Sequence, residues 1–294
     1  MSPRLRAALV ALVALSASGG GVRAGTLRAS DDRGAQIVLS SPARRVVTLA
    51  PHLTELAYAA GGAATMVGAD SASDYPPAAA GLPRVGDAAG LDLERILALR
   101  PELAFGWLSG NRPSDIARLR QLGVPVFLSE PRRLSDIPRT LRVMGLLLGT
   151  AAVAEQSAHA FERRLQELRL HAAVSPPVAV FFEVWHQPLI TVTTEHLMSD
   201  VVALCGGYNV FGSLSVLAPA VSLESVLLKD PEAIIAAGVP PGALAGWDRF
   251  PRMRAVRGHQ IYEVDADVLT RATPRVLDGA AQVCRRLEGA SKPK

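Results

Sequence analysis

The chain has 294 residues, of which 49% are hydrophobic and 20% are charged, and its formal net charge is +4. Its basic residues form no long runs, and the pairs that occur include Arg132-Arg133, Arg163-Arg164 and Arg285-Arg286. A nucleic-acid-binding surface concentrates Lys and Arg on one face, so we expect no nucleic-acid partner.

The first 24 residues have the pattern of a secretory signal peptide. Arg4 and Arg6 precede an apolar stretch at residues 7–15, and small residues follow up to Ala24. The apolar stretch is shorter than the roughly 20 residues that cross a bilayer, and no later stretch qualifies, so we expect no membrane-spanning helix. Cleavage after Ala24 would leave 270 residues with 28 basic and 27 acidic side chains, which is a formal charge of +1.

The first half of the mature chain alternates predicted strands with short helices. Pro51-His52 is expected to be a turn, and the helix after it is closed by the pair Gly61-Gly62. A second helix is capped by Asp92 and stopped by Pro101. The strands are expected at residues 45–50, 65–69, 102–107 and within 121–130. This alternation predicts a parallel sheet with helices on its faces.

The stretch from Ser135 to about Ala173 has apolar residues at helical spacing and almost no helix breakers. It is the longest predicted helical stretch of the chain, and we interpret it as a rigid connector.

The alternation resumes after this connector. Strands are expected at residues 178–184, 233–238 and 259–264, and helices at 196–207 and from the second repeat copy at 222. Thr273 is expected to cap a terminal helix with Pro274 at its first position.

Residues 92–105 and 222–235 are two copies of one pattern, offset by 130 positions. The identical pairs are Leu93/Leu223, Glu94/Glu224, Leu97/Leu227, Pro101/Pro231 and Glu102/Glu232. The fold class we predict is therefore α/β: two similar parallel-sheet lobes joined by a single long backbone helix, with a ligand cleft between them. The expected division is a signal peptide (1–24), an N-terminal lobe (25–134), a connecting helix region (135–174) and a C-terminal lobe (175–291).

Glu94 and Glu224 occupy the second helical position in the two copies. Each could simply complement the positive end of its helix, which is worth about 0.3–1 kcal/mol. Alternatively, two equivalent carboxylates on two equivalent lobes could engage a symmetric partner, such as a two-fold membrane transporter.

The two cysteines, Cys205 and Cys284, lie 79 positions apart in a chain expected to be exported. Export favours a disulfide, which would stabilise the fold by about 4 kcal/mol in the chain-entropy model. The alternative is a pair of buried free thiols, and neither interpretation makes them nucleophiles.

A resemblance to a known family is carried by the segments RVVTLAPHLTELAYAAG, SDYPP, LDLERILALRPELAFGW, ALCGGYNVF, VSLESVLLKDPEAII and LTRATPRVLDGAAQVC. Together, over about residues 44–287, they resemble the periplasmic cobalamin-binding proteins of bacterial vitamin importers. More broadly they resemble the substrate-binding proteins that join two lobes by one backbone helix, a group that also carries iron-siderophores and haem.

The resemblance implies a monomer in the periplasm, soluble after signal-peptide removal, that binds cobalamin or a related corrinoid. Its partner would be a two-fold ABC permease of the inner membrane, and Glu94 and Glu224 match the glutamates that dock onto it. No cofactor and no metal site of its own are implied. The alternative ligand is an iron-siderophore or haem, for which Arg271 and also Arg84, Arg112 or Arg275 could supply positive charge.

Other positions are matched residue by residue. Tyr75 and Trp107 match aromatic residues that line the corrin pocket, Asp267 and Arg271 match polar residues near the ligand, and the placement of Cys205 and Cys284 resembles the family's disulfide. The chain departs from the pattern at Ala88 and Ala218, which replace tryptophans, and at Ile190, which replaces a phenylalanine. These departures leave the identity of the ligand open.

Ligands of such folds lie at the carboxyl ends of parallel strands, and most of these candidates follow a predicted strand. Tyr and Trp also offer a flat macrocycle broad walls with a polar tip. The full set of expected ligand-binding residues is Pro51, His52, Tyr75, Trp107, Trp185, His186, Ile190, Asp267 and Arg271. Trp247, in a surface stretch rich in Gly and Pro, is expected to be structural.

There are three alternative functions. His52, His186, His196 and Glu183 could converge on a metal ion, but they lack the short spacing of a zinc site, so we expect none. No G-x-S-x-G or phosphate-binding loop occurs, so we expect no enzyme. A periplasmic scaffold without a small ligand is the third alternative.

Overall fold

The computed structural model describes residues 26–171 and 176–290. The predicted signal peptide, and the predicted boundaries at residues 174, 175 and 291, lie outside these residues. The strands are β1 (Leu27–Ser30), β2 (Gln36–Leu39), β3 (Val46–Thr48), β4 (Met66–Ala69), β5 (Gly86–Asp87), β6 (Gly90–Leu91), β7 (Leu103–Trp107), β8 (Val126–Ser129), β9 (Val178–Glu183), β10 (Gly207–Asn209), β11 (Ala233–Ala236) and β12 (Ile261–Glu263). The α-helices are α1 (Pro51–Ala59), α2 (Leu93–Ala98), α3 (Pro113–Gln121), α4 (Asp136–Leu148), α5 (Ala151–His171), α6 (Leu197–Leu204), α7 (Leu223–Lys229), α8 (Arg254–Arg257), α9 (Ala266–Leu269) and α10 (Val276–Ala290).

Each lobe contains a four-stranded parallel sheet, and the two sheets have the same strand order. The order is β4-β3-β7-β8 in the first lobe and β10-β9-β11-β12 in the second, so both sheets run 2-1-3-4 when numbered along the chain. Every residue of β3, β8, β9 and β11 is buried, as expected for parallel strands covered on both faces. The prediction of two similar α/β lobes is confirmed.

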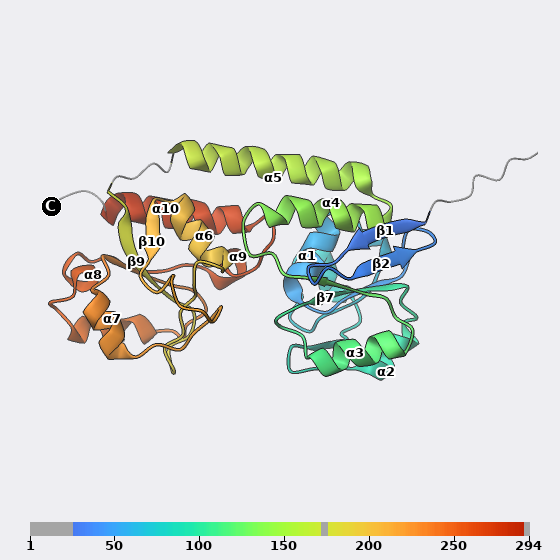
Figure 1. The fold of residues 1–294 in the computed structure, drawn as a ribbon, viewed down its shortest axis with the longest axis horizontal. Coiled ribbons are helices and arrows are strands. Elements are labelled where there is room, and N and C mark those ends of the chain that lie inside the picture. The colour runs from blue at the N-terminus through green and yellow to red at the C-terminus, as the bar shows by residue number, and fades with distance from the viewer. Residues whose placement is uncertain (1–25, 172–175, 291–294) are drawn as a thin grey trace, which may run out of the picture.

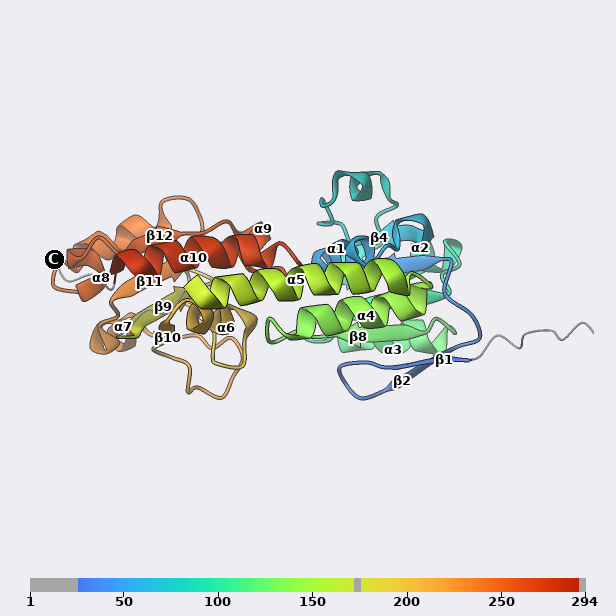
Figure 2. The ribbon, with the colours of Figure 1, turned by 90° about the horizontal axis from the view of Figure 1, so that it is seen from above.

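The long helical stretch predicted after residue 135 is divided into two helices by Gly149, which has a left-handed backbone (φ 73°). The first of them, α4, packs against α1 and β1 and so belongs to the first lobe. The second, α5, runs from the first lobe over to the second (Figures 1 and 2). The backbone helix that joins the lobes is therefore α5.

The hydrophobic core shows why this connection is firm. On the side of α5, one continuous cluster of buried side chains extends through both lobes, and Phe161 and Leu165 of α5 belong to it. On the opposite side each lobe has a separate, smaller cluster, around Ile96 in the first and Trp247 in the second. The lobes thus share their core along α5, whereas on the opposite side each lobe has a core cluster of its own.

Two helix starts differ from the prediction. The expected turn at Pro51-His52 is the first turn of α1, because proline is accommodated at the first helical position, where no N–H bond is needed. The terminal helix α10 begins at Val276 instead of Pro274, after a turn in which the Val276 N–H donates to the Thr273 carbonyl. The Thr273 hydroxyl has no hydrogen-bond partner, so the predicted cap is wrong.

The repeat contains two pairs of matched glutamates, of which one pair is hydrogen-bonded to the backbone and the other is exposed. The Glu102 carboxylate accepts a hydrogen bond from the Arg44 N–H at 2.7 Å, just before β3, and Glu232 accepts one from the Ala179 N–H of β9 at 2.8 Å. These two glutamates therefore tie the repeat to the first strand of each sheet. Glu94 and Glu224, in contrast, are exposed on α2 and α7, which lie one on each lobe on the side away from α5 (Figure 1).

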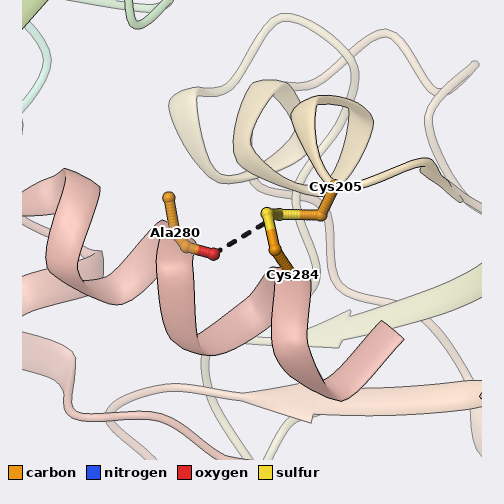
Figure 3. The surroundings of a disulfide bond; sticks show 3 residues. All are labelled: Cys205, Ala280 and Cys284. Atoms are coloured by element: carbon orange, nitrogen blue, oxygen red, sulfur yellow. Dashed lines mark hydrogen bonds between the residues drawn. A yellow bond between two sulfur atoms is a disulfide. The ribbon is translucent and has the colours of Figure 1, made fainter. Parts of the chain in front are cut away.

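Cys205 and Cys284 form the predicted disulfide, which joins the end of α6 to α10 (Figure 3). The Cys205 sulfur lies 3.4 Å from the Ala280 carbonyl oxygen. Because a disulfide sulfur carries no hydrogen, this is a close contact and not a hydrogen bond. The disulfide fastens two helices that cover the same face of the second sheet.

Candidate ligand-binding site

A cavity of about 210 Å³, partly open to solvent, lies between the two lobes. The first lobe contributes residues from the start of α1 and from the ends of β7 and β8, and the second contributes the start of α6 and the segment after α9. The lining residues are Pro51, His52, Trp107, Glu130, Pro131, His196, Leu197, Thr270, Arg271 and Ala272. Four of the nine residues predicted to bind ligand are therefore brought together here: Pro51, His52, Trp107 and Arg271.

The wall on the first lobe is built around two rings. His52 lies in this wall because it is in the first turn of α1, which begins shortly after the end of β3. Trp107 lies there because it is the last residue of β7. The rings meet edge to face, with centroids 5.2 Å apart. The Asn111 side chain holds Trp107 in place, since its Oδ1 accepts the Trp107 N–H at 2.7 Å and its Nδ2 donates to the Leu49 carbonyl at 2.8 Å.

His52 and His196 present neutral imidazoles to this cavity. Burial, and secondarily the charge of Arg271, lowers the pKa of His52 to about 4. Burial, and secondarily the charge of Arg132, lowers the pKa of His196 to about 4 as well. The His196 Nδ1 accepts the Met198 N–H at 3.3 Å, so its Nε2 carries the proton and can donate. The His52 Nε2 is buried and has no hydrogen-bond partner.

The wall on the second lobe carries the positive charge. Arg271 follows α9, and its guanidinium donates to Asp267 of its own lobe at 2.7 Å and to two acids of the first lobe, Asp74 at 2.6 Å and Glu55 at 2.9 Å. Asp267 is thus linked to the cavity through Arg271, although it does not line it.

Tyr75 is also connected to this region indirectly. Its ring lies under the guanidinium of Arg275, 3.9 Å from the ring centroid, and 42% of the residue is exposed. The loop that carries it is anchored by the buried Ser73 hydroxyl, which lies 2.7 Å from the Thr54 hydroxyl of α1. Neither Tyr75 nor Arg275 lines the cavity; Arg275 is connected to the lining residue Arg271 through their shared partner Glu55.

The other three predicted residues, Trp185, His186 and Ile190, lie together elsewhere on the second lobe. Trp185 and Ile190 form an antiparallel bridge, and Trp185 is 52% exposed, with its Nε1 donating to the Gln187 carbonyl at 2.9 Å. His186 lines a separate hollow of about 140 Å³. The sequence placed these residues after a strand correctly, but the structure does not place them on the inter-lobe cavity.

A buried carboxylate explains the position of His186. Glu183, at the end of β9, is fully buried and accepts from His186 Nδ1 at 2.7 Å and from Trp247 Nε1 at 3.0 Å. Trp247, expected to be structural, is indeed part of a core cluster, although the stretch that carries it was predicted to lie on the surface.

Sequence reasoning missed Glu55, Asp74 and Glu130, and it considered His196 only as a metal ligand. Glu130 accepts from the Trp107 Nε1 at 3.4 Å and from the Ser109 N–H at 2.8 Å. Glu55 could have been noticed as an acid among the apolar residues of its helix, because a buried charge requires a partner. Its partners, however, are more than 200 positions away. Among the described residues, no group of three or more His, Cys, Asp or Glu could hold a metal ion.

A family model described as "Periplasmic binding protein" matches residues 46–268. The chain belongs to this family. The periplasmic location predicted from the sequence is that of the family, and no helix within residues 26–171 and 176–290 is long and apolar enough to cross a membrane.

Several individual proteins of known name or structure are similar to this chain. The chain is 38% identical over 254 residues to a vitamin B12-binding protein of Vibrio cholerae serotype O1, covering 85% of this chain and 91% of the relative. The crystal structure of the periplasmic vitamin B12 binding protein BtuF of Vibrio cholerae superposes with a TM-score of 0.80 at 38% identity, over 86% of this chain and 99% of that one. The periplasmic heme-binding protein RhuT from Roseiflexus sp. RS-1 superposes with a TM-score of 0.75 at 24% identity, over 85% and 99%, which shows a shared fold.

Proposed function

We propose that this periplasmic binding protein is the substrate-binding component of an ABC importer, that it binds cobalamin or a related corrinoid, and that it catalyses no reaction. One observation carries the proposal: the cavity between the lobes presents Trp107 and His52 from one side and Arg271 from the other. An aromatic wall facing hydrogen-bond donors suits a flat macrocycle with polar side groups. The relatives named as vitamin B12-binding proteins support the choice of ligand.

The size of the cavity defines how such a ligand would bind. Small-molecule pockets usually enclose about 300–1,000 Å³, and this cavity of about 210 Å³ is smaller. A corrinoid would therefore use the cavity as a floor and extend through its open side. In that position it would reach Tyr75 and Asp267 beside the cavity, and the exposed Trp185 and Ile190 beyond it would form the outer part of the binding surface.

Delivery to the permease is assigned to Glu94 and Glu224. Both are exposed, both occupy the second position of equivalent helices, and both helices lie on the side of the molecule away from α5 (Figure 1). The pKa of Glu224 is lowered by a hydrogen bond from its own backbone N–H and by the Ser222 hydroxyl, so it is ionised in the periplasm. Two such charges fit two equivalent basic sites on a two-fold membrane partner.

The decisive experiment is a calorimetric titration of purified mature protein with cyanocobalamin, with a parallel titration of haem and of a ferric siderophore. A corrinoid-binding protein should give a dissociation constant in the micromolar range or below. Binding of cyanocobalamin no tighter than about 1 mM, which corresponds to about −4 kcal/mol, together with tight binding of haem or the siderophore, would replace the proposed ligand. Haem is the second candidate because the rings of Trp107 and His52 in the cavity wall suit a flat porphyrin as well as a corrin.

A further inference from the structure

Glu55 is a carboxylate of the first lobe that is bound by two arginines of the second. Its Oε1 accepts from Arg271 Nη1 at 2.9 Å and from Arg275 Nη2 at 2.7 Å, and its Oε2 accepts from Arg275 Nε at 2.9 Å. The Glu55 side chain is only 2% exposed. Arg275 thus binds it in the two-pronged geometry that gives Arg–carboxylate pairs their strength and fixed orientation.

The positive charges of Arg271 and Arg275 repel each other, and the carboxylate of Glu55 offsets this repulsion. Hydrogen bonding to Glu55, opposed by burial and by the positive charge of Arg271, raises the pKa of Arg275. Asp74 and Asp267 also bond to Arg271, but their side chains are 61% and 52% exposed, and Asp267 belongs to the same lobe as the arginines. Water can replace these exposed partners much more easily than it can replace a buried carboxylate.

We propose that Glu55 is a positioning residue that sets the spacing of the two lobes and holds Arg271 in the wall of the ligand cavity. The lobes share a continuous core only along α5, so their opposite halves need separate contacts to fix their distance. Glu55 supplies such a contact next to the cavity, because one of its two partners, Arg271, is itself a lining residue. The part of the proposal that concerns ligand affinity rests on the proposed function, whereas the part that concerns lobe spacing does not.

Contacts between the lobes that do not involve Glu55 limit the expected change: the exposed Asp74 keeps its bond to Arg271, and a further contact involves α6. The Leu134 N–H donates to Asp200 Oδ2 of α6 at 2.8 Å, and Arg133 lies near the same carboxylate. This contact does not involve Glu55, and α5 continues to join the lobes. Loss of the Glu55 carboxylate should therefore loosen one side of the lobe interface and alter the spacing without unfolding either lobe.

The test compares Glu55→Gln with a control variant away from the lobe interface, Glu155→Gln, whose side chain is more exposed. Glu155 also pairs with an arginine, Arg142, at 3.0 Å, but this pair joins α4 and α5 and leaves the lobe interface untouched. Nitroxide labels on Arg95→Cys in α2 and Lys229→Cys in α7 report the distance between the lobes by pulsed electron paramagnetic resonance, without ligand. For Glu55→Gln we expect a shifted, broader distance distribution and at least tenfold weaker binding of cyanocobalamin, whereas Glu155→Gln should change neither.

The outcomes separate the two proposals. A folded Glu55→Gln protein with an unchanged distance distribution would overturn the positioning role, even if its melting temperature fell, because a lower melting temperature alone indicates an ordinary structural role. If wild-type protein does not bind cyanocobalamin, the proposed function fails, while the distance measurement still decides on Glu55. If Glu55→Gln does not fold, the variant Arg275→Gln is used in its place. This substitution removes the two-pronged pair and leaves Arg271 to neutralise Glu55. An unchanged distance distribution in Arg275→Gln would also overturn the proposal.

Discussion

The imidazole of His52 and the indole of Trp107 meet edge to face, with ring centroids 5.2 Å apart, in the cavity wall of the first lobe. The two residues are 55 positions apart and come together because β3 and β7 are neighbours in the sheet. Each ring thereby restricts the orientation of the other before any ligand arrives, which lowers the entropy lost on binding.

Replacing Trp107 by alanine should weaken binding of cyanocobalamin at least tenfold, because it removes the aromatic wall and frees His52. The tenfold loss corresponds to about 1.4 kcal/mol, which is modest for a buried aromatic contact. Calorimetric titration measures the change. Trp185→Ala serves as the comparison and should weaken binding less than Trp107→Ala, because Trp185 would contact only the outer part of the ligand. Unchanged affinity of Trp107→Ala would contradict the proposed site.

Stability should fall with decreasing pH in a way that depends on His52. Burial and Arg271 lower the pKa of His52 to about 4 in the folded protein, against about 6.5 in the unfolded chain. Below pH 6.5 the unfolded state therefore binds more protons, and the folded state loses up to about 3 kcal/mol between pH 6.5 and pH 4. Urea unfolding of wild type and His52→Gln at pH 7, 5.5 and 4.5 should show a shallower decline in the variant. Parallel curves would show that His52 is not the titrating group.

The Trp247 indole should stabilise the second lobe by bonding to a buried carboxylate. Its Nε1 donates to Glu183 Oε2 at 3.0 Å, and Trp247→Phe removes this donor while keeping an aromatic ring. A carboxylate left with an unsatisfied lone pair in the core should lower the free energy of unfolding by about 1–3 kcal/mol. Trp185→Phe, at an exposed tryptophan, should change it by less than about 0.5 kcal/mol. Equal effects in the two variants would argue against this account.

Reversing the charge of the two repeat glutamates should separate binding from delivery. In the double variant Glu94→Lys/Glu224→Lys, ligand affinity should stay within about twofold of wild type, because neither residue lines the cavity. Uptake of labelled cobalamin by cells that depend on this protein should be abolished, because like charges would then face the basic sites of the permease. Normal uptake by the double variant would refute the docking role.

The disulfide should contribute a large share of the stability of the second lobe. Cys205 and Cys284 close a loop of 79 positions, and the chain-entropy model assigns such a loop about 4 kcal/mol. The double variant Cys205→Ser/Cys284→Ser should unfold at correspondingly lower denaturant concentration. Reduction of the wild-type protein should reproduce the effect, and reduction of the variant should add nothing further.

Much of the fold could be predicted from the sequence because it depends on local spacing. The Asp92 Oδ1 accepts the Arg95 N–H at 2.9 Å, and the Ser222 Oγ accepts the Ser225 N–H at 3.2 Å, as the caps of the two repeat copies require. The repeat implied two lobes of one design, and the strand order of the two sheets confirms this. The starts of α1 and α10 differed from the prediction, because residues such as Pro51 and Thr273 fit either a turn or a helix start.

The sequence by itself determined the two lobes, their helix caps and the repeated glutamates, since each depends on residue types at fixed short distances or on their duplication. Only the tertiary structure decided which side chains meet at the cavity. Glu55 and Arg271 lie 216 positions apart, and their contact exists because α5 holds the lobes so that the start of α1 faces the segment after α9. The same packing places Trp107 on the cavity and leaves Trp185 outside it, although Trp107 ends a strand of one lobe and Trp185 closely follows a strand of the other. Long-range packing sets the distance between side chains on different lobes, and no local pattern encodes that distance.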